Sequence, residues 1–186
     1  MRRLVKDVLL PVAVAVALAF VIQASVAKPY EIPTESMVPT IKANDRIIAN
    51  RLIYRFRDIE RGDVIVFDPP PAATSTCGEA GGGNIPFVKR VIGLPGDRVA
   101  VREDGVTTVN GRPFVVKAAL RPNYAIRFAV VPKDEILVMG DNRPGSCDSH
   151  QWVDASGEPA PFVPMDNVIG QAEVIYWPLS HLSFLS

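Results

Sequence analysis

The clearest structural signal in this sequence is the run Phe87-Val88-Lys89-Arg90-Val91-Ile92-Gly93-Leu94-Pro95-Gly96-Asp97. An apolar, β-branched stretch that gives way to glycine and proline is typical of a β-strand that ends in a turn. The pattern recurs after Lys28, and no segment beyond residue 30 has a long helical period. The predicted strands cover residues 46–53, 63–67, 87–92, 98–102, 107–110, 135–139 and 168–177. We therefore expect a mostly β domain built from antiparallel sheet.

The connections between these strands carry their own signals. Asn110-Gly111, in the run Val109-Asn110-Gly111-Arg112, predicts a tight hairpin, because both residues readily adopt the positive φ angles of a type I′ turn. Residues 69–84 are rich in Pro, Ser, Thr and Gly, and residues 154–164 contain three prolines and a glycine. This composition predicts two loops, the first of them an exposed excursion between strands.

An uncharged apolar segment of twenty residues, 8–27, precedes the predicted strands. A helix of that length rises about 30 Å, which matches the hydrocarbon core of a bilayer. The basic residues near the N-terminus lie ahead of it, which favours a cytoplasmic N-terminus. We expect residues 1–7 in the cytoplasm, residues 8–27 as a single transmembrane anchor in the plasma or inner membrane, and residues 28–186 as an exported domain.

A cleaved secretory signal is the main alternative for this segment, because Ser25-Val26-Ala27 has the small residues of a cleavage site. Its apolar core, however, exceeds the roughly 7–15 residues usual for such a signal. A buried soluble helix would carry a polar stripe at helical spacing, and this segment has none. Both observations favour the retained anchor.

Charge and composition exclude two classes of function. The net charge is zero and no basic cluster follows residue 6, so nucleic-acid binding has no electrostatic support. The two cysteines and two histidines lack metal-ligand spacing. We expect no metal, no cofactor and no nucleic-acid partner.

Ser36 and Lys89 together predict nucleophilic catalysis. A serine hydroxyl is a poor nucleophile near neutral pH until a neighbouring base takes its proton. Lysine can be that base only if its amine is held neutral, which burial among apolar residues achieves. Lys89 is flanked by Phe87, Val88, Val91 and Ile92, which could supply such burial. The pairing is a hypothesis at this point, because only the fold could bring the two residues together.

Four further sequence blocks accompany the Lys89 run, in this order along the chain. They are Ile32-Pro33-Thr34-Glu35-Ser36-Met37-Val38-Pro39-Thr40, Asn44-Asp45-Arg46-Ile47-Ile48-Ala49-Asn50-Arg51, Arg61-Gly62-Asp63-Val64-Ile65-Val66-Phe67, which precede Lys89, and Gly140-Asp141-Asn142-Arg143 with Ser146, Asp148 and Ser149, which follow it. With these blocks the chain resembles type I signal peptidases, membrane-anchored serine proteases with a Ser-Lys dyad, over nearly its whole length. A lone Ser-Met-x-Pro is a weak signal, whereas all the blocks in the family's order behind one apolar segment are a strong one.

The resemblance implies roles for the two central residues and for Thr34. Ser36 would attack the scissile carbonyl, and Lys89 would act as general base and then protonate the leaving amine. The Thr34 hydroxyl would join the Ser36 backbone N–H in an oxyanion hole, where each donor lowers the barrier by roughly 3 kcal/mol. A hydroxyl bonded to nearby backbone is the alternative for Thr34, since threonine often does this in turns.

The resemblance also implies a supporting set. Ser146 would hydrogen-bond and orient the catalytic lysine. Asp141 and Asp148 would pair with basic neighbours, with Arg90 as the partner of Asp141. A simple β-turn at Asp141-Asn142 is compatible with this role.

Two departures from the family pattern place the supporting set in question. Pro144-Gly145 follows Gly-Asp-Asn-Arg where the family usually has Asp-Asn, and His150 stands where it often has arginine. Proline fixes φ and removes a donor, so this loop is expected to be stiffer or differently routed. His150 would give Asp148 a titratable partner in place of a permanent charge.

The implied substrates are signal-peptide-bearing precursor proteins, which are cleaved where an extended segment with small residues emerges from the membrane. An extended peptide can add to an exposed strand edge. Residues 31–34 and 85–87 are the expected edges, and their prolines suit edge positions. The few residues between the anchor and Ser36 reach at most about 28 Å. Ser36 is therefore expected to work at the outer surface of the lipid bilayer.

Three other functions are considered. Self-cleaving repressors of the SOS type share a Ser-Lys dyad, but they need a cytosolic chain with a DNA-binding segment. A conjugation-type maturation peptidase with one dedicated substrate is the alternative within the same superfamily. A membrane-anchored, non-enzymatic assembly factor would be indicated by loss of Ser36 or Lys89, and the sequence has both.

Cys77 and Cys147 remain open between two states. An oxidising compartment permits a disulfide, and the bridge would close a loop of about 70 residues and contribute roughly 4 kcal/mol. Two free thiols are the favoured expectation, because disulfide geometry cannot be judged from sequence.

Overall fold

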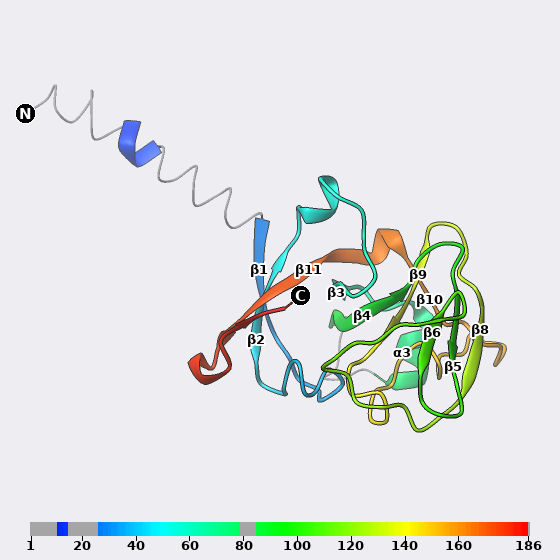
Figure 1. The fold of residues 1–186 in the computed structure, drawn as a ribbon. Coiled ribbons are helices and arrows are strands. Elements are labelled where there is room, and N and C mark those ends of the chain that lie inside the picture. The colour runs from blue at the N-terminus through cyan, green and yellow to red at the C-terminus, as the bar shows by residue number, and fades with distance from the viewer. Residues whose placement is uncertain (1–10, 15–25, 79–84, 186) are drawn as a thin grey trace, which may run out of the picture.

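The computed structural model describes residues 11–14, 26–78 and 85–185 of the chain (Figure 1). Most of the predicted membrane span, residues 8–27, lies outside these ranges, which include only residues 11–14, 26 and 27 of it. Within them, no helix has both the length and the apolar character needed to cross a bilayer. The first strand, β1 (Ala27–Glu31), starts at the last residue of the apolar segment.

An eight-stranded antiparallel sheet forms the larger part of the domain, as predicted. Its strands are β1, β2 (Arg46–Asn50), β3 (Val64–Phe67), β4 (Phe87–Gly93), β9 (Glu135–Met139), β10 (Phe162–Pro164), β11 (Val168–Trp177) and β12 (Ser183–Phe184). The order is β1-β2-β11-β3-β4-β9-β10, and β12 pairs with β11 outside this path. Ser36 lies between β1 and β2, whereas Lys89 lies on β4, so the sheet itself has to bring them together.

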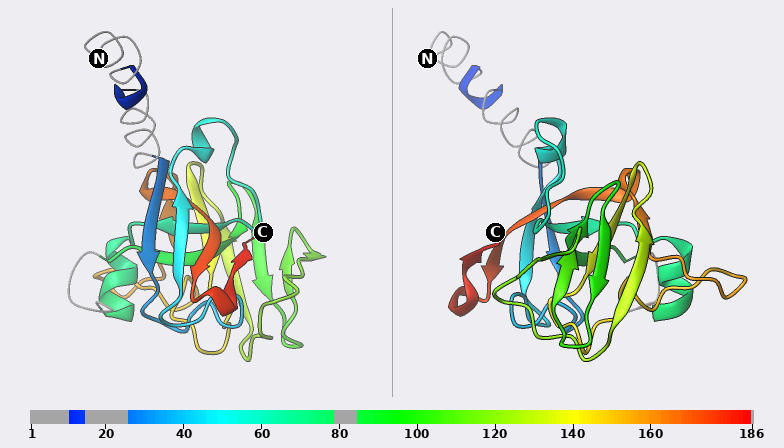
Figure 2. Two further views of the ribbon diagram at one scale, coloured as in Figure 1. Left: turned by 90° about the vertical axis from the view of Figure 1, so that its left-hand side faces the viewer. Right: turned by 45° about the vertical axis from the view of Figure 1, so that its right-hand side comes forward.

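A second, four-stranded sheet has the order β7-β6-β5-β8 and faces the viewer in the right-hand panel of Figure 2. Its strands are β5 (Arg98–Val101), β6 (Thr107–Val109), β7 (Arg112–Pro113) and β8 (Ile126–Val130). The hairpin predicted at Asn110-Gly111 is confirmed, since Val109 pairs with Arg112. Asn110 and Gly111 have φ angles of 52° and 78°, which explains why these residue types occupy the turn.

Buried side chains on both faces hold the large sheet in place. Val64 and Val66 of β3 belong to one apolar cluster, which includes Met37 below the Ser36 turn. Ile65 and Phe67 point to the opposite face and belong to a second cluster. Successive strand residues alternate between faces, so an uninterrupted apolar strand is expected where both faces are covered.

All seven predicted strands correspond to observed ones, but several boundaries differ. The strand predicted over residues 46–53 ends at Asn50, whose side-chain oxygen accepts the N–H of Leu52 at 3.0 Å and starts a turn. The 3₁₀-helices η2 (Ile53–Arg55), η3 (Met165–Asn167) and η4 (Leu179–His181) occupy connections. β1 was not predicted, because Lys28 and Pro29 interrupt its apolar pattern, and proline is tolerated there at the sheet edge.

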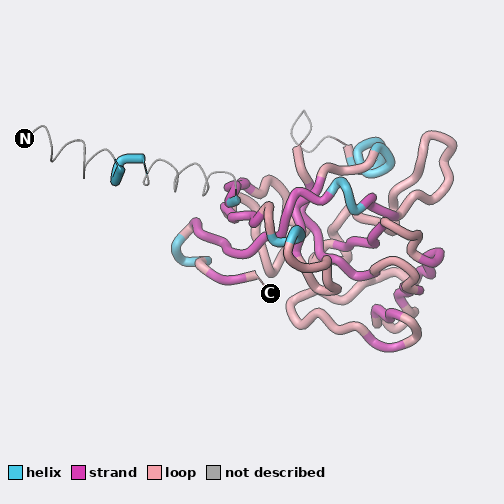
Figure 3. Tube along the Cα trace, turned by 90° about the horizontal axis from the view of Figure 1, so that it is seen from above, coloured by secondary structure: helices cyan, strands magenta, loops and turns pink. Residues whose placement is uncertain are grey.

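The prediction of a loop over residues 69–84 is wrong in part, because α3 (Pro71–Cys77) forms there. Proline at the first helical position costs no hydrogen bond, so Pro71 begins this helix. Ala72 and Ala73 are buried against the cluster that contains Trp152. Residues 79–84 of the predicted loop lie outside the described residues. The second predicted loop, 154–164, contains β10 at its end, and Figure 3 shows the loops between the strands in pink.

Candidate active site

Ser36 lies in the turn between β1 and β2 and is half-buried. The next residue, Met37, is fully buried and fixes the turn to the core. The carbonyl oxygen of Ser36 accepts the backbone N–H of Asn142 at 3.0 Å, and the Asn142 side-chain amide donates to the Glu35 carbonyl at 3.1 Å. The Ser36 turn is therefore attached at two points to the loop that follows β9.

Lys89 lies in the middle of β4, opposite Ile65 of β3, and its residue is only 3 % exposed. Its Nζ donates to Ser146 Oγ at 2.7 Å. No carboxylate of the described residues forms a salt bridge with it. Burial lowers the pKa of the Lys89 amine from 10.5 to about 8, although the charges of Asp148 and Asp141 oppose this shift. A neutral amine is thus accessible close to neutral pH.

Gly140 allows the Ser36 turn and Ser146 to approach each other. A Cβ at position 140 would lie 2.2 Å from Ser146 Oγ and 2.3 Å from the Ser36 carbonyl oxygen. The contact with the Ser36 carbonyl oxygen is with backbone, so no side-chain movement could relieve it. The glycine is therefore required for close approach of the two segments.

Thr34 lies two residues before Ser36, and the two hydroxyl oxygens are 3.2 Å apart, within hydrogen-bond distance. The Thr34 side chain is half-buried, so it can reach a group bound beside Ser36. This contact is between side chains and differs from the backbone contact considered as the alternative for Thr34.

One cleft contains Ser36, Thr34 and Lys89 and has a volume of about 220 Å³. Both segments predicted to bind an extended peptide line it. Its other walls come from the ends of β1, the start of β4 and the segments around the two cysteines: Tyr30, Glu31, Ile32, Pro33, Glu35, Cys77, Gly78, Ile85, Pro86, Phe87, Val88, Gly145 and Cys147. The structure thus places the two central residues in the same cavity, although they are far apart in the sequence.

Arg90, the residue after Lys89 on β4, forms a buried ion pair with Asp141. Arg90 donates from Nε to Asp141 Oδ1 at 2.8 Å and from a terminal nitrogen to Oδ2 at 2.6 Å. It also donates to the Gly62 carbonyl at 2.7 Å, and Thr40 donates to the same carboxylate. The pairing of Arg90 with Asp141 is thus present, and it links β4 to the loop after β9.

Asp148 and His150 occupy the part of the loop where the family pattern is broken. One Asp148 oxygen accepts the Gly140 N–H at 2.7 Å, and the other lies 2.6 Å from His150 Nδ1. The His150 ring stacks on Tyr124, with centroids 4.0 Å apart and planes 10° apart. His150 therefore takes the position of partner to Asp148. In the second departure, the Gly145 N–H donates to the Asn142 carbonyl at 2.9 Å and closes a tight turn.

Cys77 and Cys147 form a disulfide, so the expectation of two free thiols is wrong. The bond connects the last residue of α3 to the residue between Ser146 and Asp148. The Trp152 indole N–H donates to Cys77 Sγ at 3.2 Å, which places the bridge against the core. The sequence analysis left this bridge open as the less favoured state, because it did not predict α3, which ends at Cys77.

Of the seven predicted site residues, Ser36, Thr34 and Lys89 line this cleft. Ser146 contacts Lys89, and the other three form hydrogen bonds within or to the loop that follows β9. The sequence analysis did not single out three residues that contribute to the site. Gly140 allows the close approach of two segments, Asn142 holds the Ser36 turn, and Tyr124 stacks on His150. Gly140 and Asn142 belong to a block already quoted, whereas Tyr124 had no local signal. In the part of the chain that the structure describes, no three His, Cys, Asp or Glu side chains are grouped so that they could hold a metal ion.

Comparison with known proteins gives matches along most of the chain. The family model described as signal peptidase, peptidase S26, matches residues 5–177. Probable signal peptidase I-2 of Synechocystis is 40% identical over 173 residues, which cover 92% of this chain and 73% of the relative. Signal peptidase I of Mycobacterium tuberculosis is 36% identical and covers 90% of this chain and 70% of its own length.

A solved structure, signal peptidase I from Enterococcus faecalis, matches with a TM-score of 0.42 and 25% identity, over 62% of this chain and 97% of that chain. The family assignment rests on the sequence comparisons, because both the family model and the relatives span most of the chain. The chain therefore belongs to the signal peptidase family, peptidase S26.

Proposed function

We propose that this protein is a membrane-anchored serine endopeptidase that removes signal peptides from exported precursor proteins. The observation that carries the proposal is the amine of Lys89, which is buried in the same cleft as Ser36 and has a pKa of about 8. A structural lysine gains nothing from such an environment, whereas a general base needs it.

In the proposed mechanism, Ser36 Oγ attacks the scissile carbonyl while its proton passes to the neutral amine of Lys89. The ammonium then protonates the leaving amine, and the C–N bond breaks to give an acyl-enzyme. A water molecule then attacks the ester while Lys89 takes its proton, and the C–Oγ bond breaks as Lys89 returns that proton to Ser36 Oγ, which releases the carboxyl product. Ser146 holds the amine through its hydrogen bond of 2.7 Å and so limits the directions in which Nζ can point.

Thr34 and the Ser36 backbone N–H stabilise the oxyanion. The Thr34 hydroxyl is 3.2 Å from Ser36 Oγ, close to the place where the carbonyl oxygen would develop its charge. Donors that are fixed before the reaction stabilise that charge without further reorganisation. Arg90, Asp141 and Asp148 hold the loop that carries Ser146, and they do not take part in the chemical step.

The precursor binds as an extended strand between two free edges. β1 is the end strand of the large sheet, and pairing between β4 and β9 begins at Arg90, which leaves residues 87–89 open on that side. Main-chain hydrogen bonds to these edges would align the scissile bond with Ser36. The cleft between these edges, about 220 Å³ in volume, would receive the side chains that precede the scissile bond.

The anchor places this cleft at the membrane surface. Residues 8–27 span the bilayer with the N-terminus in the cytoplasm, and β1 begins at the last of these residues. The catalytic domain therefore lies on the outer side, where cleavage sites emerge during export.

Full-length protein in vesicles, incubated with a signal-bearing precursor, tests the proposal. We expect one new N-terminus directly after the signal peptide with wild-type protein and none with Ser36→Ala. Several unrelated precursors should be compared, because processing of one alone would indicate a dedicated maturation peptidase. No processing of any precursor by the folded wild-type chain would contradict the proposal.

A further inference from the structure

The loop after β2, residues 51–57, rises beside the start of β1. Figures 1 and 2 show it in cyan, extending past the first residues of that strand. The Arg51 N–H donates to the Val26 carbonyl at 2.8 Å. Val26 belongs to the apolar segment 8–27, so the loop is hydrogen-bonded to the end of that segment.

Inward-facing residues fix the base of this loop. The Arg57 guanidinium donates to both oxygens of Asp63, at 2.9 and 3.0 Å, and to Gln171 Oε1 at 2.8 Å. The Tyr54 hydroxyl donates to Asp63 at 3.0 Å. These contacts hold the backbone on the domain and orient the residues between them.

The tip of the loop has the opposite character. Phe56, directly after η2, is 84% exposed. Arg55, the last residue of η2, and Arg51, which directly follows β2, are also exposed. Within the described ranges, neither arginine forms a salt bridge, whereas Arg57 does. The loop therefore presents to its surroundings one aromatic ring and two positive charges that no salt bridge neutralises.

We propose that residues 51–57 form a phospholipid-binding loop. Arg51 and Arg55 bind headgroup phosphates, and the Phe56 ring enters the boundary between headgroups and acyl chains. Aromatic rings favour this layer, and basic residues are attracted to anionic lipid. The inference rests on the proposed function, because it requires residues 8–27 to be the anchor.

The bond to Val26 favours lipid over a soluble partner as the occupant. If the anchor ends at Ala27, this loop is held at the level where the chain leaves the bilayer. One attachment through β1 would leave the domain free to rotate above the membrane. A second contact through this loop restricts that rotation and gives the cleft a defined orientation toward the emerging substrate.

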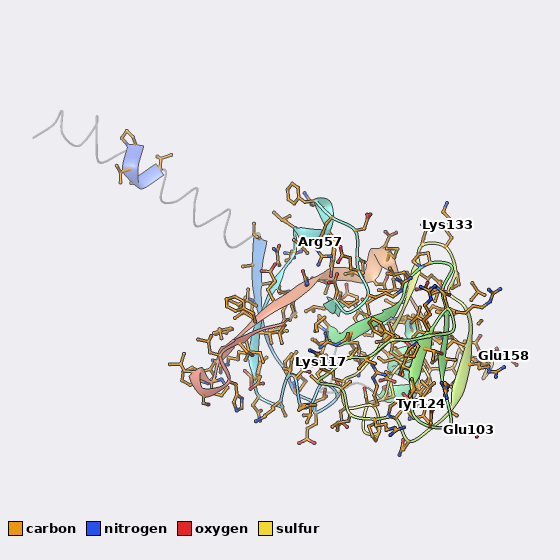
Figure 4. The ribbon with its side chains drawn as sticks, in the orientation of Figure 1. Arg57, Glu103, Lys117, Tyr124, Lys133 and Glu158 are labelled. Atoms are coloured by element: carbon orange, nitrogen blue, oxygen red, sulfur yellow. A yellow bond between two sulfur atoms is a disulfide. The ribbon has the colours of Figure 1, made fainter. Side chains whose placement is uncertain are left out.

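The first test measures the depth of the loop in the full-length chain. Phe56→Cys is labelled with an environment-sensitive fluorophore under non-reducing conditions, where the disulfide protects both native cysteines. The protein is placed in vesicles of phosphatidylcholine and phosphatidylglycerol that contain a lipid with a nitroxide quencher near the headgroup. Glu158→Cys is the control, since Glu158 is exposed and Figure 4 shows it on the side of the domain away from β1. We expect quenching at position 56 and not at 158, and equally weak quenching at both would overturn the inference.

The second test concerns charge. Arg51→Gln with Arg55→Gln is introduced into the chain labelled at position 56, and Arg98→Gln with Arg112→Gln is the matched control in the small sheet. We expect the ratio of inserted to free loop to fall about fivefold for each loop arginine removed, with no change in the control. Unchanged quenching in the loop variant would remove the arginines from the lipid site.

Flotation of wild-type protein with the vesicles distinguishes failure of the membrane anchor from failure of the lipid-binding loop. If the wild-type chain does not float, the anchor is wrong and the lipid-binding loop is wrong with it. If the chain floats and cleaves precursor while the label at position 56 is not quenched, the proposed function stands and only this inference fails.

Discussion

Lys89 and Arg90 are neighbours on β4 and are equally buried, at 3 % and 4 % exposure, but their surroundings differ. Arg90 donates two hydrogen bonds to a carboxylate, whereas the hydrogen-bond partner of the Lys89 amine among the described residues is the hydroxyl of Ser146. Strand alternation sends the two side chains to opposite faces of the sheet, which makes this difference possible within one residue.

The comparison separates two uses of a buried cation. A buried charge with a well-placed partner remains charged and holds structure together, but it is costly to break. A buried amine without a carboxylate partner gives up its proton more easily, and the pKa of Lys89 falls to about 8. Lysine suits the second use and arginine the first, because arginine cannot be deprotonated in proteins.

Exchanging the two residue types is the strongest test of this contrast. Lys89→Arg keeps the charge and cannot serve as a base, so we expect precursor cleavage to fall by roughly 10⁴–10⁶-fold, as with Lys89→Met or Ser36→Ala. Initial rates of precursor cleavage measure the effect. Lys42→Arg, an exposed site outside the cleft, is the control. Appreciable cleavage by Lys89→Arg would contradict the assignment of Lys89 as general base.

Breaking the ion pair should affect stability. Arg90→Met leaves Asp141 buried without its partner, and we expect the free energy of unfolding to drop by about 3–5 kcal/mol. Arg102→Gln breaks the exposed pair with Asp104, which should be worth less than about 1 kcal/mol. Thermal unfolding of both variants checks the difference, and similar small shifts would mean that the buried pair is not structural.

Thr34 tests the oxyanion hole beside Lys89. Thr34→Val removes the hydroxyl with little change in shape, so kcat should fall by roughly 10²–10³-fold with little change in KM. Thr34→Ser keeps the hydroxyl and should remain active. Steady-state kinetics on both variants decides the point, and a fully active valine variant would show that backbone donors are sufficient.

Ser146 tests whether a hydroxyl is enough to orient the amine. Ser146→Ala frees Lys89 Nζ, and misplacement of a catalytic group costs about 10²-fold in kcat. Ser149→Ala is a matched control on the same buried loop, since the Ser149 hydroxyl accepts the Val138 N–H, whereas the Ser146 hydroxyl accepts from Lys89. Equal kinetic losses in the two variants would indicate a general loss of structure.

The pH dependence of precursor cleavage is expected to show the smallest effect. Lys89 must be neutral to accept a proton, and its pKa is lowered from 10.5 to about 8. Activity should therefore rise with pH, about tenfold per pH unit below 8, and level off above it. The profile of kcat/KM reports the free enzyme and should show this midpoint. A flat profile between pH 6 and 9 would contradict a lysine base.

The sequence allowed most of the sheet to be predicted, because strand patterns are local. β9 and β11 match their predicted boundaries, and the hairpin at Asn110-Gly111 follows from turn chemistry alone. α3 was missed because three successive prolines indicate a loop, although one of them starts a helix whose alanines are buried by distant residues. The helical conformation of this segment depends on tertiary packing, which a local sequence pattern does not reveal.

Some contacts of the candidate site were likewise expected from the sequence, and others depend on tertiary packing. The contacts of Lys89 with Ser146 and of Arg90 with Asp141 were expected from the resemblance. The disulfide was not the favoured expectation, because it depends on where α3 ends relative to the loop after β9. The stacking of Tyr124 on His150 joins two loops, and neither sequence segment contains a pattern that predicts it.

The disulfide also has a consequence for a peptidase whose own chain is cut. Ser36 precedes Cys77, and Lys89 lies between Cys77 and Cys147, within a sequence separation of 70 residues. A cut by another copy between residues 78 and 88 would put the nucleophile and the base on different fragments, yet the bridge would keep those fragments in one molecule. Such autolysed enzyme would run as a single band on a non-reducing gel and as two bands after reduction. Tolerance of self-digestion is thus built into the covalent connectivity of the active site.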